Sequence, residues 1–429
     1  MIRFYNARVL TMEQGIDMME NAEVWTDGDK ISFVGKPDKQ QLDRTEFERQ
    51  TDLKGDLIMP GLKNAHTHSA MTFLRSYADD MPLQDWLFKQ VFPMEAKLNE
   101  ERVYHLTKLA ILEYLTCGCT AAYDMYFFLD GYVRACVESG FRSVMCSSIS
   151  GDESKLPQLE DDIKKYNSTG SDLISFIPGV HAEYTCSKGL IQGMGELARK
   201  YKLPTAMHSS ETEKEVDECI SRYGMTPTQL FESVGAFDFG GTTFHNVYLT
   251  LEDMDILRRR KVVCVHCPAS NLKLASGIAP VAEMEKMGIE TALGTDGPAS
   301  NNALDMFREM YLMTVLQKVS RKDAAAFGPG KVLRAATVGG ARAMHLDRCD
   351  IIAPGKQADL VVIDLNKPNM QPVNNIAANI VYSADKTNVR LTMCAGKVLY
   401  ENGEFFVGED PQRIYANANR VTNEMKNEL

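Results

Sequence analysis

Histidine is scarce in this chain of 429 residues, and its eight copies are unevenly placed. Six of them lie at or next to the end of a short apolar run of the kind that forms a buried strand: His66, His68, His181, His208, His245 and His266. Imidazole is a common metal ligand and a general acid or base near neutral pH. One histidine at such a position usually packs in a core, but six at equivalent positions predict a reactive site.

His66 and His68 are separated by a single residue. On a strand, the side chains of residues i and i+2 face the same way, so both imidazoles can reach one metal ion. We expect His208 and Asp296 to add ligands from two later runs. Three neutral imidazoles and a carboxylate with an open position suit catalytic Zn²⁺, and Fe²⁺ is also chemically reasonable. The run that ends at His181 has no lysine to become a bridging carboxylated ligand, so we expect one divalent ion.

Two further residues are placed to handle protons. Glu211 follows His208 by three residues in the segment HSSETEKE. A carboxylate just beyond a ligand-bearing strand can take a proton from a metal-activated water and pass it to the substrate. The alternative is a glutamate that merely favours a helix start. His245 is a candidate electrophile or hydrogen-bond partner of the attacking hydroxide, against the alternative of ordinary packing.

The elements that must position these residues lie in residues 57–357, where apolar runs alternate with amphipathic stretches. The runs end at His68, Asp124, Ser147, His181, His208, His245, His266 and Asp296. Eight β–α units predict an α/β fold, a closed parallel (β/α)8 TIM barrel. The carboxyl ends of the strands of such a barrel converge on one mouth. The sequence leaves open whether Asp124 is structural or lines that mouth.

Both ends of the chain have a different pattern, with short apolar runs broken by turn pairs. The turn pairs are Asp27-Gly28, Ala395-Gly396 and Asn402-Gly403. These patterns predict β-hairpins. Because neither end is large enough to cover its own apolar face, we expect residues 1–56 and 358–429 to build one composite β-sandwich. A final amphipathic helix should begin after Asp410, which is followed by a proline suited to the first helical turn.

The composition narrows the range of partners. The formal net charge is -11 and the isoelectric point is about 5.4, which disfavours binding to nucleic acid or to an anionic membrane. No run approaches the length of a membrane span. The ten cysteines are scattered, as expected for reduced thiols in a cytoplasmic protein. We therefore expect a small-molecule substrate, and the sequence leaves open whether the chain forms a homo-oligomer.

Several segments together resemble the amidohydrolase superfamily. They are PGLKNAHTHSAMTFLRSYADDMPLQDWL, HSSET, FHNV, SNLKLASGIAPV, GTDGPASNN and GKQADLVVIDL. They are most similar to the branch that holds the 5-methylthioadenosine/S-adenosylhomocysteine deaminases, guanine deaminase and the triazine hydrolases. The resemblance covers nearly the whole chain, including the expected composite sandwich.

The resemblance implies roles for individual residues. The metal ligands would be His66, His68, His208 and Asp296. Glu211 matches the glutamate that shuttles the proton, and His245 matches the histidine that assists the hydroxide. Asp296 would also relay a proton to the leaving amine. Both Glu211 and Asp296 would therefore contact the substrate.

Three more residues match substrate contacts of the adenosine-type deaminases. By the resemblance, Trp86 lines the pocket, Glu95 holds the ribose hydroxyls, and His181 touches the substrate. Without the resemblance, Trp86 and Glu95 would be interpreted as a buried aromatic residue and a solvated helix charge.

The chain departs from the family pattern in two places. Ser147 stands where some members carry an arginine, and the following loop, which can offer a second one, is shortened. Those arginines would pair with the carboxylate of S-adenosylhomocysteine, although Lys155 in the loop could replace them as a point charge. Glu183 stands where the branch usually has proline, and we expect its charge near the pocket to disfavour a carboxylate.

The sequence therefore predicts a metal-dependent hydrolytic deaminase of adenine nucleosides, which attacks C6 of the purine and releases ammonia. The alternative with the same machinery is an aminohydrolase or chlorohydrolase of guanine, another nucleobase or a triazine. A third hypothesis is a catalytically dead barrel used for binding. Such a protein would be expected to lose metal ligands, whereas here the full set is present.

Overall fold

The centre of the molecule is formed by eight parallel strands in two four-stranded sheets. A computed structural model describes residues 1–77, 79–81 and 86–429. The first sheet contains β6 (Leu62–Thr67), β7 (Cys119–Tyr126), β8 (Arg142–Ser147) and β9 (Ile174–Ile177). The second contains β10 (Thr205–Ser209), β11 (Gly241–His245), β12 (Val262–His266) and β13 (Thr291–Leu293). The order and parallel direction of these strands are those expected of successive β–α units.

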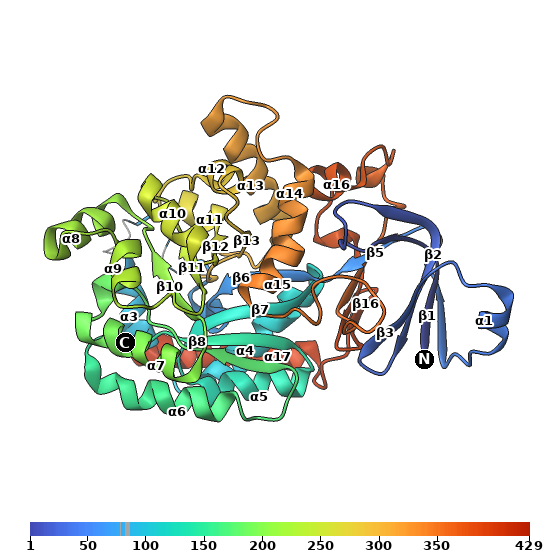
Figure 1. Cartoon of the computed structure of the whole chain (residues 1–429). Coiled ribbons are helices and arrows are strands. Elements are labelled where there is room, and N and C mark those ends of the chain that lie inside the picture. The colour runs from blue at the N-terminus through green and yellow to red at the C-terminus, as the bar shows by residue number, and fades with distance from the viewer. Residues whose placement is uncertain (78, 82–85) are drawn as a thin grey trace.

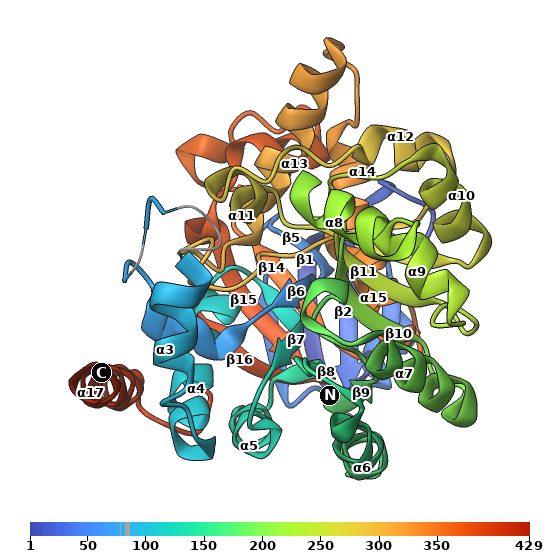
Figure 2. The same ribbon diagram turned by 90° about the vertical axis from the view of Figure 1, so that its left-hand side faces the viewer.

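Helices surround the strands, as Figure 2 shows. The first group is α3 (Phe92–Glu95), α4 (Glu100–Thr116), α5 (Leu129–Ser139), α6 (Leu156–Tyr166), α7 (Lys188–Tyr201), α8 (Glu213–Tyr223) and α9 (Pro227–Ser233). The second is α10 (Leu251–Arg259), α11 (Pro268–Lys273), α12 (Val281–Lys286), α13 (Met306–Arg321), α14 (Pro329–Arg334) and α15 (Gly340–Ala343). The strands are buried on both faces, which explains their continuous apolar sequences.

The two sheets meet at two seams that are not continuous strand ladders. At the first seam, the amide of Ala206 donates to the carbonyl of Pro178 over 3.1 Å. At the second, the amide of Asp296 donates to the carbonyl of His66 over 3.0 Å. Isolated backbone hydrogen bonds of this kind join β9 to β10 and β13 to β6.

Both chain ends build a nine-stranded sheet beside these strands (Figure 1). The N-terminal part supplies β1 (Ile2–Leu10), β2 (Met18–Asp27), β3 (Lys30–Gly35), β4 (Arg49–Asp52) and β5 (Leu57–Pro60). The C-terminal part supplies β14 (Leu360–Ile363), β15 (Val389–Cys394), β16 (Lys397–Glu401) and β17 (Glu404–Phe405). Antiparallel pairing of β5 with β14 joins the two parts. The predicted contribution of both ends is confirmed.

The composite unit, expected to be a β-sandwich, is one nine-stranded sheet that curls back on itself. Its far edge returns to the chain before β14, where Ile31 donates to the carbonyl of Lys356 over 2.8 Å and Ala358 donates to that of Asp29 over 2.7 Å. Curling lets one sheet enclose its own apolar core, which includes Phe4 and, from β14, Leu360 and Val362.

The run from residue 57 to residue 68, expected to be one strand, is divided between two sheets. Its first half is β5 in the composite sheet, and its second half is β6. Gly61 lies at the change of direction. A Cβ atom there would stand 2.2 Å from Cγ2 of Thr120, so only glycine allows β5 to pass this close to β7.

The final helix begins where it was expected. α17 (Pro411–Asn427) is capped by Asp410, whose side chain accepts from the amide of Gln412. Its buried residues are Ile414, Ala418, Val421 and Met425. Two short helices, α1 (Lys39–Asp43) and α16 (Ile376–Ala378), belong to the two chain ends, residues 1–56 and 358–429.

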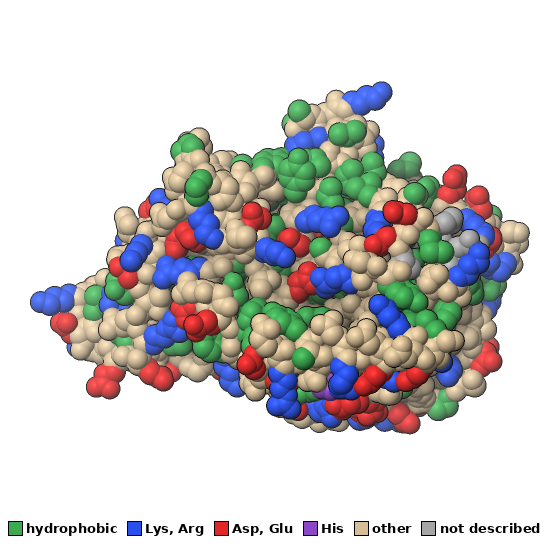
Figure 3. Space-filling model, turned by 180° about the vertical axis from the view of Figure 1, so that it is seen from behind, with side chains coloured by type: hydrophobic (Ala, Val, Ile, Leu, Met, Phe, Trp, Pro, Cys, Tyr) green, Lys and Arg blue, Asp and Glu red, His purple; other side chains and the backbone are tan. Residues whose placement is uncertain are grey.

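Two general expectations can be compared with the structure. No helix among the described residues is long and apolar enough to cross a membrane. All ten cysteines are free and buried. The face drawn in Figure 3 carries acidic and basic side chains interspersed with one another.

Candidate metal and catalytic site

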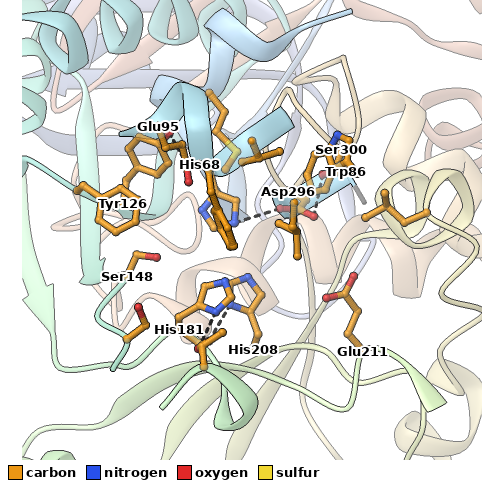
Figure 4. A pocket seen from close by; sticks show the side chains of 18 of the residues that line it. His68, Trp86, Glu95, Tyr126, Ser148, His181, His208, Glu211, Asp296 and Ser300 are labelled. Carbon is orange, nitrogen blue, oxygen red and sulfur yellow. Dashed lines mark hydrogen bonds and ion pairs between the residues drawn. The ribbon is translucent and has the colours of Figure 1, made fainter. Parts of the chain in front are cut away.

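Four predicted ligands converge at the carboxyl ends of the parallel strands. His66 Nε2 lies 3.1 Å from His208 Nε2. One carboxylate oxygen of Asp296 lies 3.6 Å from His66 Nε2 and 3.3 Å from His68 Nε2. His66, His68 and His208 offer nitrogen atoms that all lie within 4.8 Å of one another, and the ligand atoms of His66, His245 and Asp296, the last a carboxylate oxygen, are equally close. Figure 4 shows His68, His208 and Asp296 facing one cavity.

The backbone fixes the orientation of two of these rings. Nδ1 of His68 lies 2.6 Å from the carbonyl oxygen of Met125, and Nδ1 of His208 lies 2.8 Å from that of His181. A carbonyl only accepts, so each Nδ1 carries a proton and each Nε2 is the atom that faces the centre. A metal ion would bind at these Nε2 atoms and would take the place of the proton that Asp296 favours on His68.

The electrostatics of the site also fit a cation. Burial and the neighbouring histidines lower the pKa of His66 and His208 well below the usual value, so both rings are neutral. Burial alone would lower the pKa of His68, but the hydrogen bond and charge of Asp296 raise it to about 9. The site therefore favours positive charge between His68 and Asp296, as a divalent ion would provide.

Asp296 is held firmly at the second seam. Its carboxylate accepts hydrogen bonds from Ser270 Oγ at 2.5 Å, Ser300 Oγ at 3.0 Å and the amide of Gly297 at 2.7 Å. Its backbone has a φ of 59°, a strained value for this residue type that is common at functional sites. Gly294 allows the approach, because a Cβ atom there would lie 2.6 Å from the amide nitrogen of His66.

Glu211 and His245 lie together beside the ligands. Oε2 of Glu211 is 3.8 Å from Nε2 of His245. Ser276 donates to the other carboxylate oxygen of Glu211 over 3.3 Å, and burial raises the pKa of this carboxyl group. Nδ1 of His245 lies 2.8 Å from Oδ1 of Asn271, which orients the ring so that Nε2 faces Glu211. A carboxyl group with a raised pKa is suited to proton transfer near neutral pH.

The three residues expected to contact substrate line the same cavity of about 120 Å³, which also exposes Glu211, His245 and Asp296. Trp86 forms part of its apolar wall. Glu95 accepts a hydrogen bond from the hydroxyl of Tyr126 over 2.8 Å, and burial raises its pKa to about 7. Burial lowers the pKa of His181 to about 4, so this ring is neutral.

Glu183, expected to bring a negative charge near the pocket, does not line the cavity, and its charge is paired with a cation. Its side chain is buried and forms an ion pair with Arg222, with oxygen–nitrogen distances of 2.6 and 2.8 Å. The residue does not line the cavity, because the short turn after β9 directs it toward α8. The sequence shows the charge but not its partner, which lies 39 positions away.

The residues at the first-sheet strand ends have other environments. Ser147 donates to the carbonyl of Gly179 over 3.0 Å. Ser147 and Lys155 line an outer cavity of about 740 Å³, which adjoins the inner one at Glu95. Asp124 accepts from the amide of Ser69, directly after His68, over 2.7 Å; this contact assigns it a structural role.

The sequence does not predict individually the residues that hold Glu211, His245 and Asp296. Ser270, Asn271 and Ser276 belong to the segment SNLKLASGIAPV, yet nothing in its pattern indicates that they contact Asp296, His245 and Glu211. Such contacts depend on how α11 lies across the strand ends. The only available signal was the position of the segment directly after the His266 run.

A model of the amidohydrolase family matches residues 57–399. The chain belongs to this family. The chain is 38% identical to a 5-methylthioadenosine/S-adenosylhomocysteine deaminase of Thermoanaerobacter pseudethanolicus, over 97% of this chain and 98% of the relative. It is 37% identical to a 5'-deoxyadenosine deaminase of Methanosarcina acetivorans, over 98% and 97%. The resemblance seen in the sequence motifs is confirmed.

Solved structures show the same relationship. An adenosine deaminase from Xanthomonas campestris with bound zinc has a TM-score of 0.94 and 32% identity, and the match covers 99% of this chain and 98% of that one. A zinc-bound atrazine chlorohydrolase of Arthrobacter aurescens has a TM-score of 0.90 at 22% identity, covering 98% and 100%. The second likeness supports the fold alone.

Proposed function

We propose that this amidohydrolase is a metal-dependent hydrolytic deaminase of adenine nucleosides. One observation carries the proposal: Glu211 and His245 lie against the cluster of His66, His68, His208 and Asp296 in one buried cavity. The near full-length deaminase relatives support it. The donor set suits one Zn²⁺, with Fe²⁺ as the alternative, and the relatives of known structure include zinc-bound proteins.

The proposed architecture is a (β/α)8 barrel in which the two parallel sheets act as one closed ring. The hydrogen bonds at the two seams support this arrangement. We propose residues 57–357 as the barrel domain, with residues 1–56 and 358–429 as the composite domain, although β5 itself pairs with β1 and β14. A barrel would place the whole site at its carboxyl-end mouth.

The proposed reaction replaces the amino group at purine C6 by oxygen. When bound, a divalent ion supplies a water molecule whose pKa is lowered from about 15.7 to about 7. Glu211 takes a proton from the attacking water and delivers it to the ring nitrogen next to C6. Nε2 of His245 is oriented to accept a hydrogen bond from the attacking oxygen. Asp296 takes the remaining proton of the attacking oxygen and passes it to the amino group, the C6–N bond breaks, and water and nucleoside thereby give the inosine product and ammonia.

The alternative is an aminohydrolase or chlorohydrolase of guanine, another nucleobase or a triazine, which would use the same proton-handling residues. Two features favour a nucleoside. Glu95 places a half-buried carboxyl group in the cavity, where it can accept hydrogen bonds from ribose hydroxyls, and Trp86 supplies an apolar wall for the base. The adjoining outer cavity leaves room for a 5′ substituent.

Nucleosides with a neutral 5′ group should be better substrates than S-adenosylhomocysteine. Neither cavity is lined by an arginine among the described residues, and a lost charge-assisted hydrogen bond of about 1.5–3 kcal/mol should lower affinity by roughly ten- to hundredfold. The test compares kcat/KM, by coupled ammonia release, for 5′-methylthioadenosine, adenosine, 5′-deoxyadenosine and S-adenosylhomocysteine, then repeats it with Ser147→Arg. The Ser147→Arg variant should have a higher kcat/KM for S-adenosylhomocysteine than the wild type, with little change for the neutral nucleosides.

A wild-type preference for S-adenosylhomocysteine would refute this argument and would indicate Lys155 as the partner of its carboxylate. Activity on guanine or a triazine, without activity on any adenine nucleoside, would support the alternative function instead.

The KM for nucleosides should fall as the pH rises through about 7. Because the pKa of Glu95 is raised to about 7 by burial, its carboxylate becomes available to ribose hydroxyls only near and above that pH. Glu95→Gln should raise KM about ten- to hundredfold at pH 8 and remove the pH dependence. Steady-state kinetics between pH 6 and 8 check this.

Thermal unfolding provides the control for the Glu95 variant. When the pKa of a carboxyl group is higher in the folded protein than in the unfolded chain, the folded protein loses stability as the pH rises from about 4.5 through 7. Glu95→Gln removes that ionisation and keeps an acceptor for Tyr126, so its Tm at pH 8 should not fall below that of the wild type. A lower Tm with unchanged KM would assign Glu95 a purely structural role.

A further inference from the structure

Glu215 is a buried carboxylate that the proposed reaction does not use. It lies in the first turn of α8, and its side chain points back toward the loop after β10. Its two oxygens accept hydrogen bonds from two successive backbone amides, Ser210 at 2.8 Å and Glu211 at 2.7 Å. The second amide belongs to the residue proposed to carry the proton.

This contact differs from that of the other capping boxes in the described part of the chain. In a capping box, the side chain at the third helical position accepts from the amide of the N-cap residue. That distance is 2.9 Å for Gln41 in α1, 3.1 Å for Gln229 in α9, 2.9 Å for Asp253 in α10 and 3.0 Å for Asn388 in the short 3-10 helix Lys386–Asn388. In α8 the N-cap amide of Thr212 is 3.5 Å from Glu215. The side chain of Glu215 makes its shortest bonds beyond the cap, with the loop that bears Glu211.

The same loop has an uncommon backbone conformation. Ser210 has a φ of 54°, in the left-handed region that non-glycine residues rarely adopt. On its other side, the carbonyl of Ser210 accepts from the amides of Val247 and Tyr248, both at 2.9 Å. These amides lie two and three residues after His245. The loop is thus held between Glu215 and the segment that carries the partner of Glu211.

We infer that Glu215 is a positioning residue that sets the place of Glu211 relative to His245 and the substrate. The inference rests on the proposed function, since Glu211 transfers the proton only there. Both oxygens of Glu215 are required. Glutamine at this position has one acceptor oxygen, and its amino group would face a backbone N–H that also donates.

The first test does not depend on activity. Hydrogen exchange by mass spectrometry should show the amides of Ser210 and Glu211 exchanging at least about tenfold faster in Glu215→Gln than in the wild type, with metal content unchanged. Gln229→Ala, which removes an ordinary capping-box side chain from α9, is the matched control and should leave this loop unchanged. Unchanged exchange in the loop of Glu215→Gln would overturn the inference.

The second test is a double-mutant cycle. Misplacing a catalytic group by about 1 Å can cost up to about hundredfold in rate, so Glu215→Gln should lower kcat about ten- to hundredfold with KM changed less than about threefold. In a Glu211→Gln background, the same change should lower the residual kcat less than about twofold. Equal effects in both backgrounds would show that Glu215 acts on general structure and would overturn the inference.

The two proposals fail in distinguishable ways. A wild-type protein that deaminates no nucleoside contradicts the proposed function, while the exchange experiment still decides the role of Glu215 in holding the loop. If Glu215→Gln unfolds, Glu215→Asp keeps both oxygens on a shorter arm. It should show intermediate exchange and an intermediate kcat, and wild-type values for both would count against the inference.

Discussion

Replacing Glu211 by glutamine should lower kcat by about 10²–10⁴-fold while metal content and fold stay unchanged. Glutamine is nearly isosteric and can still accept from Ser276, but it cannot carry a proton. Glu211 lies 3.8 Å from His245 and is not one of the residues whose donor atoms cluster tightly enough to hold an ion. Single-turnover kinetics together with metal analysis check this expectation.

The matched control is Glu213→Gln, which alters an exposed glutamate in the same segment and should retain wild-type kcat. A near-normal kcat for Glu211→Gln would show that another group transfers the proton. Loss of the metal ion from Glu211→Gln would instead show that this carboxylate is a ligand, and the roles assigned to the site would have to change.

Removing the metal ion should abolish turnover, and one equivalent of Zn²⁺ per chain should restore it. Without a cation, water is too weak an acid to be deprotonated at neutral pH. We therefore expect kcat to fall by about 10³-fold or more when the metal ion is removed. His208→Ala should lose the ion, because its Nε2 atom lies 3.1 Å from that of His66 at the centre of the ligand set. Elemental analysis and metal titration of activity measure both effects.

His105→Ala provides the control for His208→Ala. His105 pairs with Glu101 on α4, away from the ligand cluster, and its replacement should leave metal content unchanged. Two tightly bound ions per chain, both required for activity, would contradict a mononuclear site.

The convergence of the candidate metal ligands could be predicted because it depends on local geometry. The i, i+2 spacing of His66 and His68 fixes their common face on β6, and the convergence of parallel strand ends brings in His208 and Asp296. Each expectation needs only a strand direction and a residue position. Trp86, Glu95 and His181 line the cavity onto which these candidate ligands open.

Contacts between distant segments could not be predicted in the same way. Glu183 carries a charge, and only the fold shows that Arg222 neutralises it away from the cavity. The curled composite sheet likewise depends on the chain before β14 meeting β3, which no local pattern specifies. Long-range partners are decided by tertiary packing, whereas strand position is decided by the spacing of apolar residues.

The pairing of β5 with β14 has a consequence for how the chain folds during its synthesis. Residues 57–60 emerge from the ribosome some three hundred positions before residues 360–363, their antiparallel partners. Until then, β5 has an open edge on that side, and unpaired strand edges promote aggregation of nascent chains. Strands this far apart in sequence also pair slowly, because a long loop must close first. The composite sheet should therefore be the last part of the molecule to fold, and truncated translation products should be prone to capture by chaperones.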